Sequence, residues 1–356
     1  MVPRWTLVVP LFGLALLGAT VLWPVGTALA WLCAAALIAA VQAAVYHAEV
    51  VAHRLGEPFG TLVLALAVTV IEAALILSVM LASGTDKTAL ARDTIFSAVM
   101  IICNGVVGLC LVVGGLRHHE QSFRVEGATS SLAALVALST LSLVLPSFTI
   151  TSPGPSYSPA QLAFAALASL VMWAVYVFAQ TVKHRDYFLP PSLAADGAAH
   201  AAPPRLAQAW LSFCLLIAAL VAVVGLAKAL SPSIEAALAA TGAPKGAVGI
   251  AIALLVLLPE TLAAVRAAHL NRLQTSFNLA YGSALASIGL TIPVVAIASL
   301  WLGIPLTLGL DHKDMVLLVL TFVVSTLTLA FGRTHMLQGA VHLVIFAAFA
   351  FLAFVP

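Results

Sequence analysis

Two glutamates lie deep inside long apolar stretches of this sequence. Glu72 comes about twelve residues into the apolar run 60–82, and Glu260 stands at a similar depth in the run 247–268. At a rise of about 1.5 Å per residue, each side chain would lie near the middle of a helix that crosses a bilayer. A charge at that depth costs roughly 2.5–3.5 kcal/mol on insertion scales. We therefore expect both glutamates to have a function other than packing.

Two carboxylates that face each other suit a hard cation, because such cations prefer oxygen ligands. They suit protons equally well, since burial and the nearby like charge both raise carboxyl pKa values. We predict that Glu72 and Glu260 are the metal-binding residues and that protons compete for the same oxygens. The alternative is that each is a protonated glutamate that hydrogen-bonds between helices.

Further polar and small residues stand in the neighbouring apolar runs. They provide amide and hydroxyl oxygens, or they allow close helix approach, and Pro259 removes a backbone hydrogen bond directly before Glu260. For each polar residue the alternative is ordinary helix–helix hydrogen bonding, and for the proline it is a simple kink. The supporting ion-path residues predicted in this way are Asn104, Asn278, Gly282, Ser283, Ser287 and Pro259.

The composition indicates which solvent surrounds the elements that position these residues. Of the 356 residues, 63% are hydrophobic and 8% are charged, whereas soluble domains carry about 25% charged residues. The apolar runs are continuous rather than alternating, which favours helices over a membrane barrel. We predict an all-α polytopic membrane protein with about eleven spans: Trp5–Leu22, Val25–Tyr46, Gly60–Ala82, Thr94–Leu116, Ala128–Leu145, Ala160–Val182, Ala209–Leu230, Ala247–Ala268, Ser276–Leu302, Met315–Phe331 and Met336–Phe354.

The spans divide into two related halves. An extra N-terminal helix occupies residues 1–23, a first five-helix repeat 24–182, a proline-rich cytoplasmic linker 183–208, and a second five-helix repeat 209–356. Each glutamate lies in the second helix of its half. Because five is odd, the second repeat would be inverted relative to the first, a plan found in many secondary transporters.

Loop charges predict the orientation in the membrane. Counted alternately, the loops on the N-terminal side hold ten Lys and Arg residues, and those on the other side hold five. The positive-inside rule then places the N-terminus in the cytoplasm and the C-terminus outside. The basic residues stand singly between apolar runs, so the sequence predicts no nucleic-acid surface.

Other residue patterns argue against enzymatic chemistry. The sequence contains neither an HExxH motif nor a pattern of paired catalytic residues, so we expect neither enzyme activity nor a cofactor. The spacing of the cysteines predicts no zinc site, and His342, inside the last span, is interpreted as a hydrogen-bonded structural histidine. The four cysteines, which all lie in apolar runs, are Cys33, Cys103, Cys110 and Cys214.

Several longer motifs resemble those of one family. His47-Ala48-Glu49, residues 52–61 and Thr69-Val70-Ile71-Glu72 are similar to the first signature of bacterial ChaA-type cation/proton antiporters. Residues 180–188 resemble the end of that family's sixth helix. Leu258-Pro259-Glu260 and residues 282–293 resemble its second signature. One departure is that Val99-Met100 stands where the second repeat has Gly282-Ser283.

The resemblance implies a member of the calcium:cation antiporter superfamily, on the calcium/proton exchanger side. It implies a bacterial inner-membrane protein in which Glu72 and Glu260 bind the cation and the protons, with Asn104 and Ser287 on the flanking helices. The expected function is calcium/proton antiport by alternating access, with sodium and potassium as further candidate cations. The alternatives are a monovalent sodium/potassium–proton antiporter and an uncoupled cation channel.

Overall fold

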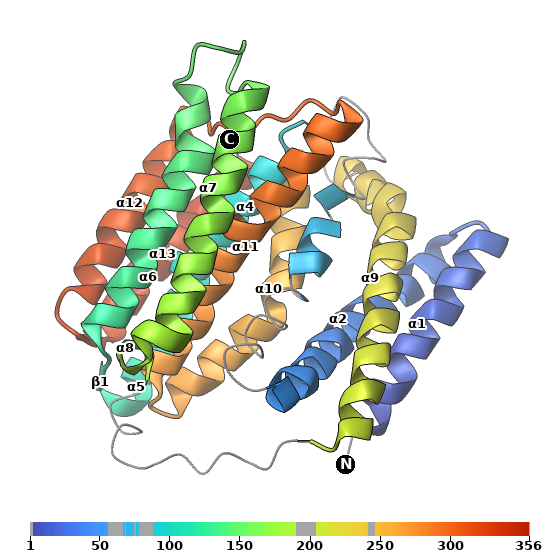
Figure 1. Cartoon of the computed structure of the whole chain (residues 1–356), viewed down its shortest axis with the longest axis horizontal. Helices are drawn as coiled ribbons and strands as arrows, with labels where there is room; N and C mark the ends of the chain where they lie inside the picture. Colours follow the sequence, from blue (N-terminus) through green and yellow to red (C-terminus); the bar gives the residue numbers. More distant parts are fainter. Residues whose placement is uncertain are drawn as a thin grey trace. The chain divides into compact units, whose positions relative to one another are not determined.

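The computed structural model describes residues 3–55, 67, 69–74, 76–77, 88–189, 204–240 and 246–355. These residues are helical apart from connecting segments and two three-residue strands, so the predicted all-α class is confirmed (Figure 1). In this part of the chain, nine helical segments are long and apolar enough to cross a membrane. Eleven spans and inverted repeats stay predictions, and most of the predicted span 60–82 lies outside the described residues.

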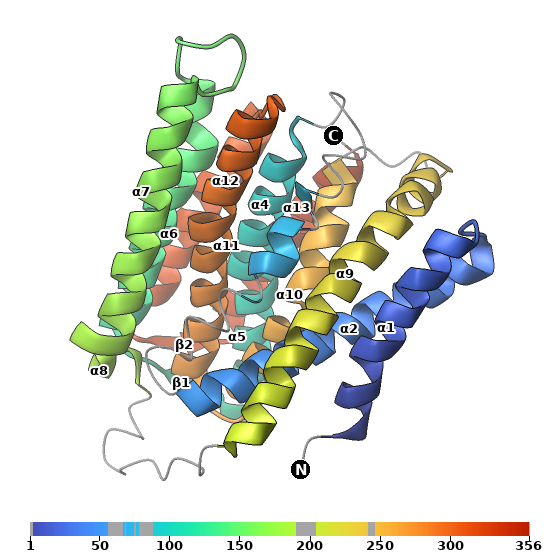
Figure 2. The ribbon, with the colours of Figure 1, turned by 45° about the vertical axis from the view of Figure 1, so that its right-hand side comes forward.

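The chain forms two compact units, and each combines residues from both predicted halves. The first contains residues 1–87 and 200–248, and the second contains residues 88–199 and 249–356. In the first unit, α1 (Arg4–Leu22), α2 (Thr27–Leu55) and α9 (Leu206–Ala240) pack side by side (Figure 2).

Helix α2 continues nine residues beyond the predicted end at Tyr46. His47 is fully buried, and its Nε2 lies 2.8 Å from the backbone oxygen of Thr6 in α1. Pro10 lacks the N–H group that would otherwise bond to this oxygen four residues earlier in the helix. His47 therefore satisfies the carbonyl that Pro10 leaves without an intrahelical partner, and this polar contact joins α1 to α2.

The second unit holds the remaining elements. Their bounds agree with the predicted spans to within a few residues, and α10 contributes residues 249–269 to this unit. The elements are α4 (Leu90–Met100), η2 (Ile101–Val106), α5 (Val107–His118), β1 (Glu120–Ser122), α6 (Val125–Ser139), η3 (Thr140–Val144), η4 (Leu145–Ser147), α7 (Pro159–Phe178), η5 (Ala179–Lys183), α8 (Arg185–Phe188), α10 (Gly246–His269), α11 (Leu273–Leu302), α12 (His312–Leu329), β2 (Arg333–His335) and α13 (Met336–Phe354).

Glycines allow two pairs of helices in this unit to approach closely. A Cβ atom on Gly289 of α11 would lie 2.6 Å from the Cβ atom of Trp173 in α7. Where α5 meets α13, a Cβ atom on Gly339 would lie 2.7 Å from the backbone oxygen of Gly108. Small residues at helix interfaces are typical of membrane proteins, where packing rather than hydrophobicity holds helices together. The apolar side chains of Phe164 and Leu167 on α7 are exposed, as expected of a surface in contact with lipid.

A short antiparallel strand pair closes one end of this unit. β1 and β2 pair with Gln121 opposite Thr334, and the buried Gln121 side chain donates through Nε2 to the backbone oxygen of Ala268 at 2.9 Å. At the other end, Arg92 donates through Nη1 to the backbone oxygen of Gly309 at 3.1 Å. These contacts hold together loops that are distant in the sequence and so fix the ends of the helices that carry the polar residues.

Candidate functional site

Glu72 lies in the first unit, in the helical residues 69–74. Its side chain is buried, with 2% of the residue exposed, and Thr69, one turn earlier on the same face, is 4% exposed. Ile71 and Ala73 beside it are also buried. The carboxyl group is therefore inside the protein rather than at a solvated surface, as the sequence predicts.

Glu260 lies in the second unit, in the C-terminal half of α10. It is half-buried and lies on the face that carries Leu257 and Ala264, which are 1% and 0% exposed. Pro259 is part of the same helix, so Glu260 directly follows a residue without a backbone donor. Because the two glutamates belong to different units, their pairing at one cation stays a prediction.

Hydroxyl groups form a line along α11. Ser283, Ser287 and Thr291 are spaced by four residues and so lie on one stripe of the helix, about 12 Å long. Ser287 and Thr291 are buried, and the hydroxyl oxygen atoms of Ser283 and Thr291 are buried without a hydrogen-bond partner among the described residues. Among the residues that the structure describes, a Cβ atom on the adjacent Gly282 would meet only the Tyr176 hydroxyl group, at 3.9 Å. The stripe therefore offers neutral oxygen atoms that could face a cation.

Asn278 has contacts of a different kind. Its Nδ2 donates to the backbone oxygen of Phe188 at 2.5 Å, and its Oδ1 accepts from Gln274 Nε2 at 3.0 Å. Gln274 in turn accepts a hydrogen bond from the Arg124 backbone nitrogen at 2.7 Å. These bonds connect α8 and the start of α6 to α11, so Asn278 joins three elements at this end of the unit.

Asn104 is fully buried in the π-helical segment η2, between α4 and α5. Its Nδ2 lies 2.8 Å from Thr321 Oγ1 of α12, and its Oδ1 lies 3.1 Å from His342 Nδ1 of α13. His342 and Thr321 were not among the predicted ion-path residues. The presence of His342 inside an apolar run was the available clue, whereas Thr321 resembles any other threonine in a membrane helix.

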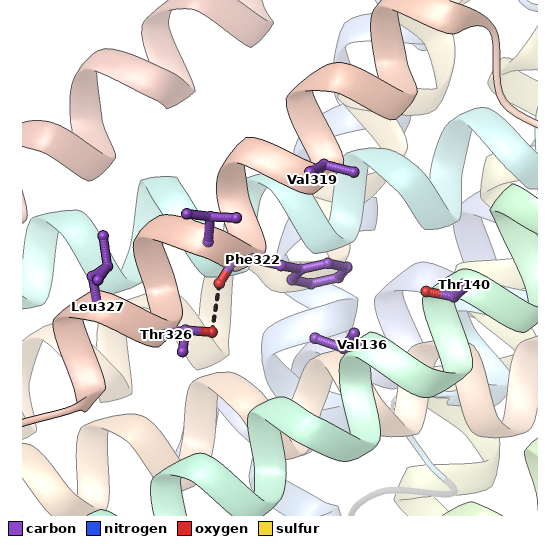
Figure 3. Close-up of a pocket in the computed structure, with 7 residues that line it drawn as sticks. Val136, Thr140, Val319, Phe322, Thr326 and Leu327 are labelled. Atoms are coloured by element: carbon purple, nitrogen blue, oxygen red, sulfur yellow. Dashed lines mark hydrogen bonds between the residues drawn. The ribbon is translucent and has the colours of Figure 1, made fainter.

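Figure 3 shows the lining of an apolar groove between α6 and α12, with a volume of about 420 Å³. The Thr326 hydroxyl group donates to the backbone oxygen of Phe322 at 2.8 Å, and the neighbouring residues are mostly aliphatic. None of the described residues that line the groove is acidic, so they offer a cation no carboxylate ligand. In the part of the chain that the structure describes, no group of three His, Cys, Asp or Glu residues is placed to hold a metal.

Comparison with known proteins agrees with the sequence resemblance. A model of the sodium/calcium exchanger protein family matches residues 25–182 and 211–355. The chain is 48% identical over 358 residues to the Sinorhizobium fredii (strain NBRC 101917 / NGR234) protein named "Putative ionic transporter y4hA", covering 100% of this chain and 97% of that protein. It is 35% identical over 355 residues to the sodium-potassium/proton antiporter ChaA of Escherichia coli (strain K12), covering 98% and 96%.

The fold also matches that of a solved exchanger. The crystal structure of the H⁺/Ca²⁺ exchanger CAX superimposes with a TM-score of 0.69 at 17% identity, covering 97% of this chain and 86% of that one. The membrane-spanning helices, the two matched segments and the ChaA relative confirm the resemblance that the motifs indicated. The chain belongs to the sodium/calcium exchanger protein family, whose members exchange cations across membranes.

Proposed function

We propose that this protein is a proton-coupled cation antiporter in which Glu72 and Glu260 hold the cation and the protons in turn. The observation that carries the proposal is the burial of Glu72 inside an apolar helical segment, with 2% of the residue exposed. Burial makes the ionised form of a carboxyl group costly, and either a bound cation or a proton lowers that cost.

The exchange cycle follows from this competition. With both carboxyl groups ionised, a cation binds; protonation of the carboxyl groups then releases it. If the cation-bound and protonated forms favour different inward- and outward-facing states, each ion is carried in one direction across the membrane. The stripe of Ser283, Ser287 and Thr291 supplies neutral oxygen atoms that would replace part of the cation's hydration shell.

Calcium is the first candidate cation, because two carboxylates neutralise one divalent ion and two protons restore the same charge. A monovalent cation would neutralise only one of the two carboxylates, so the second would need a proton or another positive charge. The second candidate is exchange of sodium or potassium, and it is favoured by the 35% identity to the sodium-potassium/proton antiporter of Escherichia coli. The proposed location is the bacterial inner membrane, with the N-terminus in the cytoplasm.

Inside-out membrane vesicles with a preformed pH gradient test the proposal. Addition of calcium, sodium or potassium should collapse the gradient, and the cation that does so identifies the substrate. Glu72→Gln and Glu260→Gln should each abolish the response. Glu120→Gln is the matched control, since Glu120 lies at an exposed surface ion pair with Arg333, and it should behave like wild type.

Two results would contradict this proposal. If none of the three cations moved protons, or if both glutamine variants retained wild-type exchange, the two-glutamate mechanism would be wrong. A channel is distinguished by a second measurement on the same vesicles. An antiporter accumulates the cation against its concentration gradient when a pH gradient is imposed, whereas a channel only equilibrates the cation.

A further inference from the structure

The contact between α5 and α13 brings His342 to Asn104. Gly108 lies four residues after Asn104, and Gly339 lies three residues before His342, so each glycine is one turn from its polar partner. A Cβ atom on Gly108 would lie 3.0 Å from the His342 Cβ atom and 3.1 Å from the Gly339 backbone oxygen. The two helices are therefore close enough for the imidazole ring to contact the amide group directly. Both residues are fully buried.

The hydrogen bonds around Asn104 determine which way its amide group points. Thr321 donates its single hydroxyl proton to the Leu317 backbone oxygen at 2.7 Å, a shorter contact than that with Met100 Sδ at 3.4 Å. Thr321 Oγ1 must then accept from Asn104, and only the amide nitrogen can donate. Asn104 Oδ1 is thus the atom that faces α13.

The same reasoning fixes the tautomer of His342. Because Asn104 Oδ1 is an acceptor, the ring nitrogen Nδ1 at 3.1 Å must carry a proton and donate it. The other nitrogen, Nε2, lies 3.0 Å from the Thr328 hydroxyl group, which in the neutral ring donates to it. One directional series of hydrogen bonds therefore runs from Thr328 through His342 and Asn104 to Thr321, joining α12, α13 and η2.

We propose that His342 is a positioning residue for cation exchange: it fixes the direction of the Asn104 side-chain oxygen. Without the Nδ1–H donor, this oxygen would lose its buried partner, and the amide group could rotate to its other orientation. The oxygen has two lone pairs, and His342 occupies one, which orients the second. This inference rests on the proposed function and on the sequence-based prediction that Asn104 is a supporting ion-path residue.

Three substitutions at position 342 test the Nδ1–H donor separately from the rest of the imidazole ring. In His342→Asn the amide nitrogen can take the place of Nδ1 and donate to Asn104. In His342→Gln the longer side chain reaches the place of Nε2, so the contact with Thr328 is kept and the contact with Asn104 is lost. His342→Leu removes both contacts. Thr321→Val removes the acceptor on the opposite side of the Asn104 amide group.

The measurement is cation-dependent proton exchange by purified variants in proteoliposomes, with the apparent KM for the cation separated from the maximal rate. We expect His342→Leu, His342→Gln and Thr321→Val to raise the apparent KM by about tenfold, as for loss of one buried hydrogen bond. His342→Asn should remain within about twofold of wild type. In the Asn104→Ala background, His342→Leu should raise the KM no further.

The outcomes distinguish this inference from the proposed function. A wild-type protein that exchanges no cation for protons overturns the proposed function and this inference with it. An active wild type in which His342→Leu has an unchanged KM, or in which His342→Asn is as impaired as His342→Leu, overturns the inference alone. If His342→Leu fails to fold, as judged by gel filtration, the apparent KM values of His342→Gln and Thr321→Val take its place. Unchanged values in both would overturn the inference.

Discussion

At the residue scale, the apolar surroundings made the polar residues conspicuous. The position of Glu72 in an apolar run predicts a functional acid inside the protein, and the structure buries this residue. His342 was predicted to be a hydrogen-bonded histidine, and its bonds to Asn104 and Thr328 confirm this. Its partners were not predictable, because they lie 238 and 14 residues away in the chain and are brought together only by helix packing.

The contact between His47 and Thr6 gives a prediction at this scale. His47→Leu should lower the free energy of unfolding by about 1–3 kcal/mol, because the Thr6 backbone oxygen is left buried without a partner. Pro10→Ala restores an N–H group that can bond to that oxygen. In the Pro10→Ala background, His47→Leu should therefore cost much less. Thermal unfolding of the four detergent-purified proteins measures this, and equal losses in both backgrounds would contradict it.

At the scale of elements, the helices were predictable and their local winding was not. The long apolar runs located the spans to within a few residues, except that α2 and α9 end nine and ten residues beyond their predicted ends at Tyr46 and Leu230. Among the described residues there are three π-helical segments, Ile101–Val106, Thr140–Val144 and Ala179–Lys183, and none of them has a recognisable sequence pattern. π-Helical turns are often found at functional sites, and the one that contains Asn104 turns this side chain toward both α12 and α13.

A glycine substitution tests the close packing of α5 against α13. Gly339→Ala should lower the free energy of unfolding by about 1–3 kcal/mol, since the new Cβ atom would lie 2.7 Å from backbone atoms of Gly108 and Val112. Gly18→Ala is the control, because a Cβ atom on this exposed glycine of α1 would have no neighbour within 4 Å. Alanine should be neutral or slightly stabilising there. Equal melting temperatures for the two variants would mean that the contact does not constrain the helices.

At the scale of the whole molecule, the compact units differ from the predicted halves. Each unit takes helices from both 24–182 and 209–356. Helices from the two predicted halves can combine in this way when the preferred packing partner of a helix belongs to the other half. In the first unit, α2 packs against α9, and in the second, α6 and α7 pack against α11. The pattern of apolar residues along the sequence locates each helix but does not indicate which other helix it packs against.

Membrane orientation gives a prediction at this scale. The segment from Val125 to Ser147 is about 34 Å long, enough to cross a bilayer, so Ser122 and Ile150 should lie on opposite sides. With the exposed Cys214 replaced by serine, Ile150→Cys in intact cells should react with a membrane-impermeant thiol reagent. Ser122→Cys should react only after permeabilisation. The variant with Cys214 replaced and no new cysteine measures the background labelling of the three buried native cysteines, Cys33, Cys103 and Cys110. The reverse labelling pattern would contradict the predicted cytoplasmic N-terminus.

The sequence by itself determined the solvent, the class of fold, the family and the two acidic residues. The solvent and the class of fold follow from local composition, and the family follows from the resemblance of the longer motifs. The two acidic residues stand out because a single charge inside a bilayer is costly, and their role as cation ligands stays a prediction. Only the tertiary structure decided that His342 and Thr321 hold Asn104, that His47 bonds to the carbonyl freed by Pro10, and that residues 120–122 pair with 333–335. These contacts join segments distant in the chain, and their geometry depends on how closely glycines and other small residues allow the helices to approach.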